Sequence, residues 1–208
     1  MKIFRKRIQK GNILLFLSFT AISLCFLLTV SATHAERWNS LSQNTLYSGR
    51  QKGFSVTYSE DENQWEEVIP ELEKENNNFA IYISAKNSDY IVRGICLKGK
   101  VLNPPMLEGE YFDFSTSWTD QPKMVLGKEC KKDVFIENDK MYYTYQDIKF
   151  EVIGIMGTEE DSRLNHMIMM DFKSAVGIVG INTDYVLDAK RDSSLVDVGQ
   201  DIYDLFRW

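Results

Sequence analysis

The chain has 208 residues, enough for one domain or for two small subdomains that share a core. Residues 1–35 hold five basic and no acidic side chains, so the rest carries 19 basic against 30 acidic, a net charge of −11. Nucleic-acid binding needs lysine and arginine to neutralise phosphates, so this charge argues against a nucleic-acid partner. It also disfavours a domain that lies flat on anionic lipid, and a solvated acidic surface is the simplest interpretation.

The first element is an apolar run over residues 13–30, preceded by the basic residues. As a helix it spans about 27 Å, and with Ser31 and Ala32 it matches the roughly 30 Å hydrocarbon core of a bilayer. The positive charge before it predicts a cytoplasmic N-terminus and an extracytoplasmic chain after Ala35. We favour an uncleaved single-pass anchor. The alternative is a signal peptide cleaved after Ala35, although such apolar regions usually have only about 7–15 residues.

Residues 37–53 are polar and contain Trp38, whose indole suits either the lipid headgroup zone or contact with the domain. A strand is predicted over residues 54–58, with Phe54, Val56 and Tyr58 on one face, and a helix over residues 60–76. Apolar side chains recur in that helix at i, i+3, i+4 and i+7, and Pro70 is expected to kink or end it. These apolar positions are Trp65, Val68, Ile69 and Leu72.

Two β-rich runs follow, residues 79–84 and 90–97, joined by the turn-prone residues 86–89. With the preceding strand and helix, they predict a β-α-β-β unit.

Residues 105–156 hold the densest pattern in the chain. They begin with an apolar segment that contains Gly109 and ends in the aromatic pair Tyr111-Phe112. A short buried strand is predicted next, over residues 124–127, and a short helix over residues 128–133. Residues 116–123 between them are expected to be a loop that carries Trp118.

Two further β-like runs, residues 141–145 and 148–156, are separated by Gln146-Asp147 and predict a hairpin. Alternation in the second run places polar side chains on one face at its start. The end of that run is apolar at every position and predicts burial on both faces.

The last part of the chain begins with an acidic run, residues 158–161, which lacks the spacing of a calcium loop and is expected to be a solvated turn. A strand over residues 167–170, a short helix or turn over 171–179 and a strand over 185–189 follow. The methionines at 156, 167, 169 and 170 are interpreted as core side chains rather than a soft-metal site. A final helix from about Leu195 has Ser194 as its predicted N-cap and an apolar face of Leu195, Val198, Ile202 and Leu205.

Three motifs in this order resemble the extracellular core domain of MacB-like and FtsX-like ABC transporter permeases. They are Leu-x-Gly-x-x-Phe at residues 107–112, Val-Leu-Gly entering a short helix at 125–129, and Phe-x-Val-x-Gly-Ile at 150–155. An arginine often follows the first motif glycine in that family, and this chain has Glu110 there. The resemblance extends over roughly residues 14–206 and is densest at 107–157.

The resemblance implies an α+β fold with a transmembrane helix followed by a mixed α/β ectodomain of two subdomains. Residues 1–35 would be the basic start and the anchor, and residues 36–208 the ectodomain. The β-α-β-β unit would form the subdomain nearer the membrane, and residues of about 105–157 a mostly-β subdomain inserted into it. The family also has further transmembrane helices, and no later apolar run in this sequence is long enough to span a bilayer. We therefore expect a truncated or split permease, or an ectodomain with another role.

Catalytic and cofactor signatures are missing from the sequence. It has no phosphate-binding Gly-x-x-x-x-Gly-Lys-Ser/Thr loop and no Gly-x-Ser-x-Gly elbow, and its two histidines, His34 and His166, are too few for a histidine zinc cluster. We therefore expect no enzyme activity, metal or cofactor, and name no catalytic, cofactor-binding or substrate-binding residue. Cys96 and Cys130 are the pair that a disulfide could join outside the membrane, but we favour two separate half-buried thiols.

Two functions follow as hypotheses. The first is a non-catalytic extracytoplasmic domain of an ABC transporter permease-like protein in the cell membrane. It would engage a substrate or partner proteins, and its partners would be the bilayer, a permease and a separate ATPase, as the resemblance implies. The second is a free-standing anchored or secreted binding or sensor module on the same scaffold, with an unidentified ligand.

Overall fold

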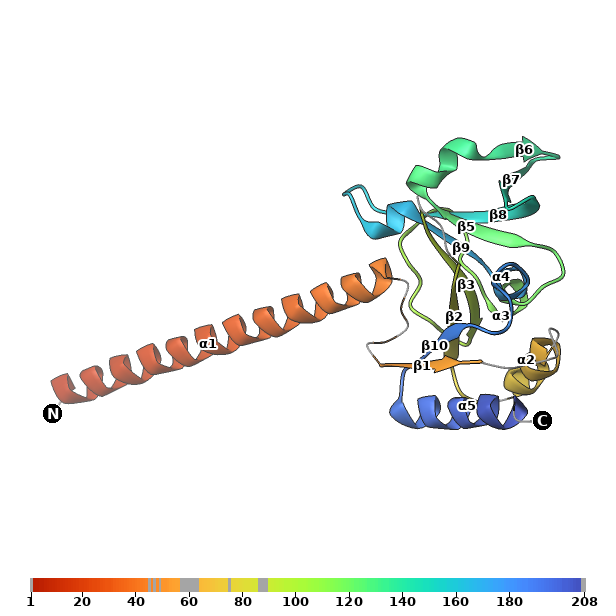
Figure 1. Ribbon diagram of the computed structural model, residues 1–208. Helices are drawn as coiled ribbons and strands as arrows, with labels where there is room; N and C mark the ends of the chain where they lie inside the picture. The colour runs from red at the N-terminus through yellow and green to blue at the C-terminus, as the bar shows by residue number, and fades with distance from the viewer. Residues whose placement is uncertain are drawn as a thin grey trace. The chain divides into compact units, whose positions relative to one another are not determined.

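The N-terminal residues form one long helix, α1 (Lys2–Gln43), and a mixed α/β domain follows it (Figure 1). The computed structural model describes residues 2–44, 46, 48, 50–56, 64–74, 76–85 and 90–206. By internal contacts the chain divides into one unit of Met1–Ser40 and a second of Leu41–Trp208. The predicted fold class, an N-terminal apolar helix and an α+β domain, is confirmed.

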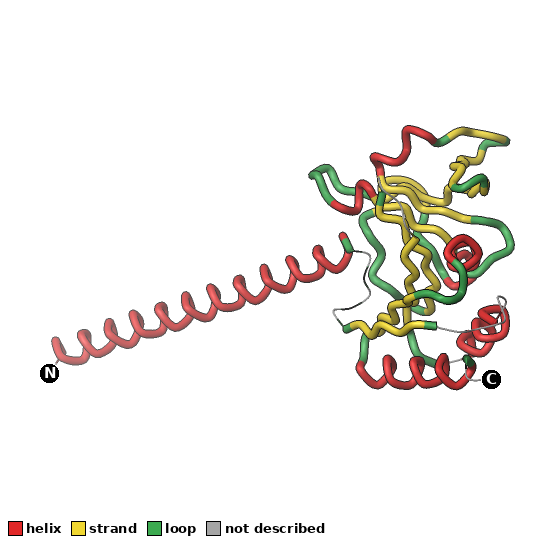
Figure 2. Tube along the Cα trace, viewed as in Figure 1, coloured by secondary structure: helices red, strands yellow, loops and turns green. Residues whose placement is uncertain are grey.

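The strands described in the second unit form one sheet of ten, coloured yellow in Figure 2. Nine of them follow the order β1-β10-β2-β3-β9-β5-β8-β7-β6, and β4 pairs with β8 beside that path. The bounds are β1 (Gln51–Ser55), β2 (Phe79–Ala85), β3 (Ile91–Lys98), β4 (Met106–Gly109), β5 (Lys123–Gly127), β6 (Phe135–Glu137), β7 (Lys140–Tyr145), β8 (Ile148–Met156), β9 (Met167–Asp171) and β10 (Asp184–Ala189).

Strand β9 joins the two parts of the sheet. It runs parallel to β3, with Ile91 opposite Met167, and antiparallel to β5, with Val125 opposite Met169. Asp171 at its end is buried and accepts hydrogen bonds from the backbone N–H groups of Ser174 and Lys123, at 2.8 and 2.9 Å. The carboxylate thereby caps α4 (Phe172–Val179) and also holds the start of β5.

Two buried clusters lie on opposite faces of the sheet, because neighbouring residues along a strand alternate between them. On one face, side chains of α2 (Gln64–Lys74), α4 and α5 (Asp192–Leu205) pack on the sheet. Trp65 is central there: its indole donates to the Tyr185 hydroxyl at 3.0 Å and its ring contacts Phe172. On the other face, Tyr111 and Phe112 cover the sheet.

The four methionines are divided between these clusters. Met170 belongs to the cluster beneath the helices, and Met156, Met167 and Met169 to the other, among aliphatic and aromatic side chains. Each is at most 1% exposed, as expected for core packing.

Most predicted elements are present with shifted ends. The predicted apolar stripe of α2 is buried, and the helix continues past Pro70 to Lys74. Strand β1 ends at Ser55, so Val56 is buried beyond it, and Tyr58 lies outside the described residues. The turn predicted at residues 86–89 also lies outside them.

The predicted N-cap of the last helix is wrong. α5 begins at Asp192, with Arg191 at the cap position and no side-chain cap. Ser194 is buried within the first turn, and its hydroxyl donates to the side-chain oxygen of Asn77 at 3.0 Å. The Ser194 hydroxyl thus bonds to a distant segment, whereas the local pattern predicted that it would cap the helix. Leu195, Val198 and Ile202 are buried as expected.

Besides the strand β4, three elements were not predicted. Strand β6 pairs with β7 through a turn at Asn138-Asp139, and both turn residues have positive φ, as do Gln146 and Asp147 in the next hairpin. Two such residues in succession produce the twist that tight hairpins need. The short helix α3 (Phe114–Ser117) is capped by Asp113, which exchanges hydrogen bonds with Thr116. The third is the 3-10 helix η2 (Arg163–His166). The short helix that was predicted over residues 128–133 is present as the 3-10 helix η1 (Lys128–Asp133).

The glycines of the first and third motifs face each other where β4 meets β8. Gly109 has φ of +66° and pairs with Gly154. A Cβ on Gly154 would overlap the Glu110 carbonyl oxygen, and a Cβ on Gly109 would overlap that of Ile153. The motif glycines therefore allow two backbones to approach closely.

We expect Gly154→Ala to lower the free energy of unfolding by about 1–3 kcal/mol, because backbone must move to admit the methyl group. Gly177→Ala is the matched control: a Cβ at that position in α4 would meet no neighbour within 4 Å, so stability should be unchanged or rise by up to about 1 kcal/mol. Urea unfolding of the detergent-solubilised protein measures both. Equal effects of the two variants would contradict this packing.

Candidate functional site

The segment of α1 from Leu15 to Gln43 is the one described helix that is long and apolar enough to cross a membrane. Its most apolar 18-residue window has a mean hydropathy of 2.1 and no buried residue. Hydroxyls within α1 donate to backbone carbonyls three or four residues earlier, which satisfies them without water. The residues that do so are Ser18, Thr20, Thr29 and Thr33.

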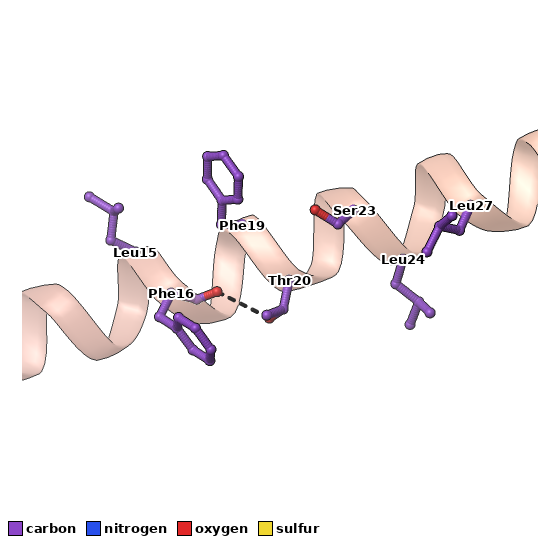
Figure 3. A pocket seen from close by; sticks show the side chains of 7 residues that line it. All are labelled: Leu15, Phe16, Phe19, Thr20, Ser23, Leu24 and Leu27. Atoms are coloured by element: carbon purple, nitrogen blue, oxygen red, sulfur yellow. Dashed lines mark hydrogen bonds between the residues drawn. The ribbon is translucent and has the colours of Figure 1, made fainter.

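A groove runs along one side of this helix (Figure 3). Its polar side chains are Thr20 and Ser23, and the Thr20 hydroxyl is hydrogen-bonded to the Phe16 carbonyl at 3.1 Å. The groove contains no ionisable group, so it offers no acid, base or charged ligand. The other lining residues are Leu15, Phe16, Phe19, Leu24 and Leu27.

The end of α1, from Leu41 on, belongs to the second unit and is hydrogen-bonded into it. The Ser42 hydroxyl donates to the Asn103 carbonyl at 3.3 Å, and the Arg93 guanidinium donates to the Asn44 carbonyl at 3.3 Å. Burial is the main cause that lowers the pKa of Arg93, which is half-buried on β3. The helix therefore ends in a turn that is built into the domain.

A pocket of about 440 Å³ lies where β4 and β7 share one edge of β8. β7 pairs with the start of β8 as far as Glu151, whereas β4 pairs with its end from Gly154. Val152 and Ile153 lie between the two paired segments of β8, and both line the pocket. Its other lining residues are Glu110, Tyr111, Asp113, Thr116, Lys123, Asp139, Lys140, Met141 and Glu151.

Charged side chains dominate this pocket. Glu151 lies 2.9 Å from the Lys140 ammonium and 3.7 Å from that of Lys123. The hydrogen bond from Lys140 is the main cause that lowers the pKa of Glu151, and the same bond raises the pKa of Lys140. The pocket thus has a fixed ion-paired carboxylate and further acidic side chains at its rim, an arrangement that suits binding of a polar molecule.

Sequence reasoning assigned a binding role to none of these pocket residues. The alternation of β8 does predict that Glu151 lies on its polar face, but Lys123 and Lys140 come from other strands. Their approach to Glu151 depends on β8 pairing with β5 on one edge and β7 on the other. The sequence predicts the β7–β8 hairpin but contains no signal for the pairing of β5 with β8.

The two predicted disulfide residues, Cys96 on β3 and Cys130 in η1, are both buried free thiols in the structure. Burial raises the pKa of Cys96 to about 12 and that of Cys130 to about 11. A disulfide between them stays a prediction.

The acidic run after β8 is folded around Asn165. The Asn165 side chain accepts from the Thr158 N–H at 2.9 Å and donates to the Glu160 carbonyl at 2.8 Å, and the carboxylates point to solvent. His166 lies 3.5 Å from Asp161. Among the residues whose placement is described, no group of three His, Cys, Asp or Glu side chains is arranged to hold a metal ion.

Comparison with known proteins gives a likeness in structure and no match in sequence. No protein-family model matches the chain, and no curated protein matches it. Among solved structures, it is similar to the extracellular domain of the noncanonic ABC-type transporter YknZ from Gram-positive bacteria. The identity is 10% and the TM-score 0.40, over 76% of this chain and 92% of that chain. A likeness at this level carries no functional argument.

We expect Cys96 and Cys130 to react slowly with iodoacetamide at pH 8 in the folded protein, because burial and a raised pKa leave little thiolate. A Cys25→Ser background removes the third thiol, and mass spectrometry counts the adducts. Unfolding should release two reactive thiols. Fast labelling of the native chain would contradict the burial of the two thiols. If the unfolded chain is labelled at neither cysteine until a reductant is added, the two cysteines form a disulfide.

We expect the Glu151 ion pairs to stabilise the fold at neutral pH and to lose that effect in acid. The folded pKa of Glu151 is lowered, so its contribution is present above the unfolded value of about 4.3 and is lost as pH falls through the folded pKa. The stability difference between wild type and Glu151→Gln should therefore shrink on acidification. Glu159→Gln, on the exposed loop, is the control and should show little difference at any pH. A Glu151 difference that is independent of pH would refute the pairing.

Proposed function

We propose that the chain is a non-catalytic, membrane-anchored extracytoplasmic domain of an ABC transporter permease-like protein, coupled to a separate ATPase. The observation that carries the anchored role is α1: an exposed apolar segment continues without a break into Leu41–Gln43, which are hydrogen-bonded into the domain. A helix built in this way can transmit a displacement at the membrane to the sheet.

The permease-like assignment is supported by the three motifs and by their structural roles. The first and third motifs meet at Gly109 and Gly154. Gly127 of the second motif lies against the Asn165 backbone, where a Cβ would overlap a carbonyl oxygen. Gly109 and Gly154 thus allow close approach within the region that would be inserted, residues of about 105–157, and Gly127 allows it against a residue beyond that region. We assign residues 1–35 to the basic start and anchor and 36–208 to the ectodomain.

The basic residues before the apolar run support a cytoplasmic N-terminus and an extracytoplasmic domain in a single-pass cell-membrane protein. We propose binding rather than catalysis because the thiols are buried and the charged pocket presents no nucleophile beside a histidine. No nucleic-acid partner, metal or cofactor is part of the proposal.

A second candidate function is a free-standing anchored or secreted binding or sensor module. The pocket on β8 favours it, because all of its lining residues come from the domain and none from α1. Such a module would need no permease, and its ligand is unidentified.

The test is mild crosslinking in membranes of the native host, followed by purification and intact-mass analysis. We expect a chain with an uncleaved N-terminus joined to a multi-helix permease or an ATPase. An uncleaved chain that remains alone would favour the free-standing module. A chain shortened after Ala35 and recovered outside the cell would refute both the anchor and the transporter role.

A further inference from the structure

Helix α1 extends past its apolar segment. If Ala32 marks the edge of the hydrocarbon core, Trp38 lies six residues, or about 9 Å, further along the axis. The headgroup layer on each side of a bilayer is about 5–8 Å thick. Helical side chains tilt toward the helix N-terminus, which here is the membrane side, so a side chain at position 38 reaches back into that layer.

Three residues in this part of α1 share a face, because they stand at i, i+3 and i+4: His34, Arg37 and Trp38. All three are exposed, Trp38 by 44%. The Trp38 indole N–H donates to His34 Nε2 at 3.2 Å, and the two ring centroids are 5.8 Å apart. The indole therefore enters a partly apolar layer with its only donor satisfied, which lowers the cost of leaving water.

Arg37 completes the face with a positive charge. The part of the chain described shows no hydrogen bond or ion pair of its guanidinium, and Glu36 beside it points to a different side of the helix. A guanidinium offers planar paired donors that match a phosphate. The residue thus lies at the depth where phospholipid phosphates are found.

We infer that the face of α1 formed by His34, Arg37 and Trp38 binds the phospholipid headgroup layer, with the indole at the level of the ester groups and Arg37 on a lipid phosphate. This inference rests on the proposed anchored role. It gives the helix a fixed depth in the membrane and places the first residue of the domain, Leu41, within a few ångströms of the headgroups.

The test uses the full chain in phosphatidylcholine vesicles that carry brominated lipids, with bromine either near the headgroup or near the end of the acyl chain. Subtracting the emission of Trp38→Phe from that of wild type isolates Trp38. We expect shallow bromine to quench this component several-fold more than deep bromine. Trp118→Phe is the matched control, because Trp118 packs on Phe172 in the domain and its component should not be quenched.

Arg37→Gln should weaken the shallow quenching of Trp38, whereas Arg50→Gln, at an exposed arginine of the domain, should not change it. A chain that floats with the vesicles while Trp38 is quenched at neither depth, or more strongly by deep bromine, would overturn the inference and leave the anchor intact. A blue-shifted but unquenched Trp38 would indicate a protein contact instead and would also overturn it. A chain that does not float would remove the anchor and the inference together.

Discussion

Helix α1 presents a surface that water solvates poorly. Along it the described large apolar side chains between residues 13 and 30 are 47–71% exposed, and Phe19 is the most exposed of them. Burying apolar surface is worth about 25 cal/mol per Å², so a helix of this kind is driven strongly out of water. Four of its hydroxyls are bonded to its own backbone, and a bilayer suits such a helix. The proposed anchoring rests on this constraint.

One continuous sheet holds the domain together. β9 pairs with β3 and β5, so the strands between residues 106 and 156 are hydrogen-bonded to the rest of the sheet. Arg93, which holds the end of α1 through the Asn44 carbonyl, also lies on β3. The residue that follows α1 is thereby hydrogen-bonded to a strand near the centre of the sheet. The pocket lies further along, on β8, where β4 and β7 leave a gap.

Elements with a strong local period could be predicted from the sequence. The stripe of α2, the alternating start of β8 and the buried strand β9 all depend on burial of their own side chains. Features decided by distant contacts could not be predicted. The Ser194 hydroxyl is hydrogen-bonded to Asn77. Strand β6 has no apolar alternation that would reveal it in the sequence. The two pocket lysines come close to Glu151 only because their strands pair with β8. The motif glycines could be recognised in the sequence. Which backbone segment packs against each glycine is known only from the structure.

The most direct test of an anchored extracytoplasmic domain is protease digestion of native membranes that have been washed at alkaline pH. The chain should remain with the washed membranes. Protease added to intact cells should then remove the domain after Leu41, whereas inside-out vesicles should protect it. Release of the chain by the wash, or digestion of the domain only from the cytoplasmic side, would contradict the account.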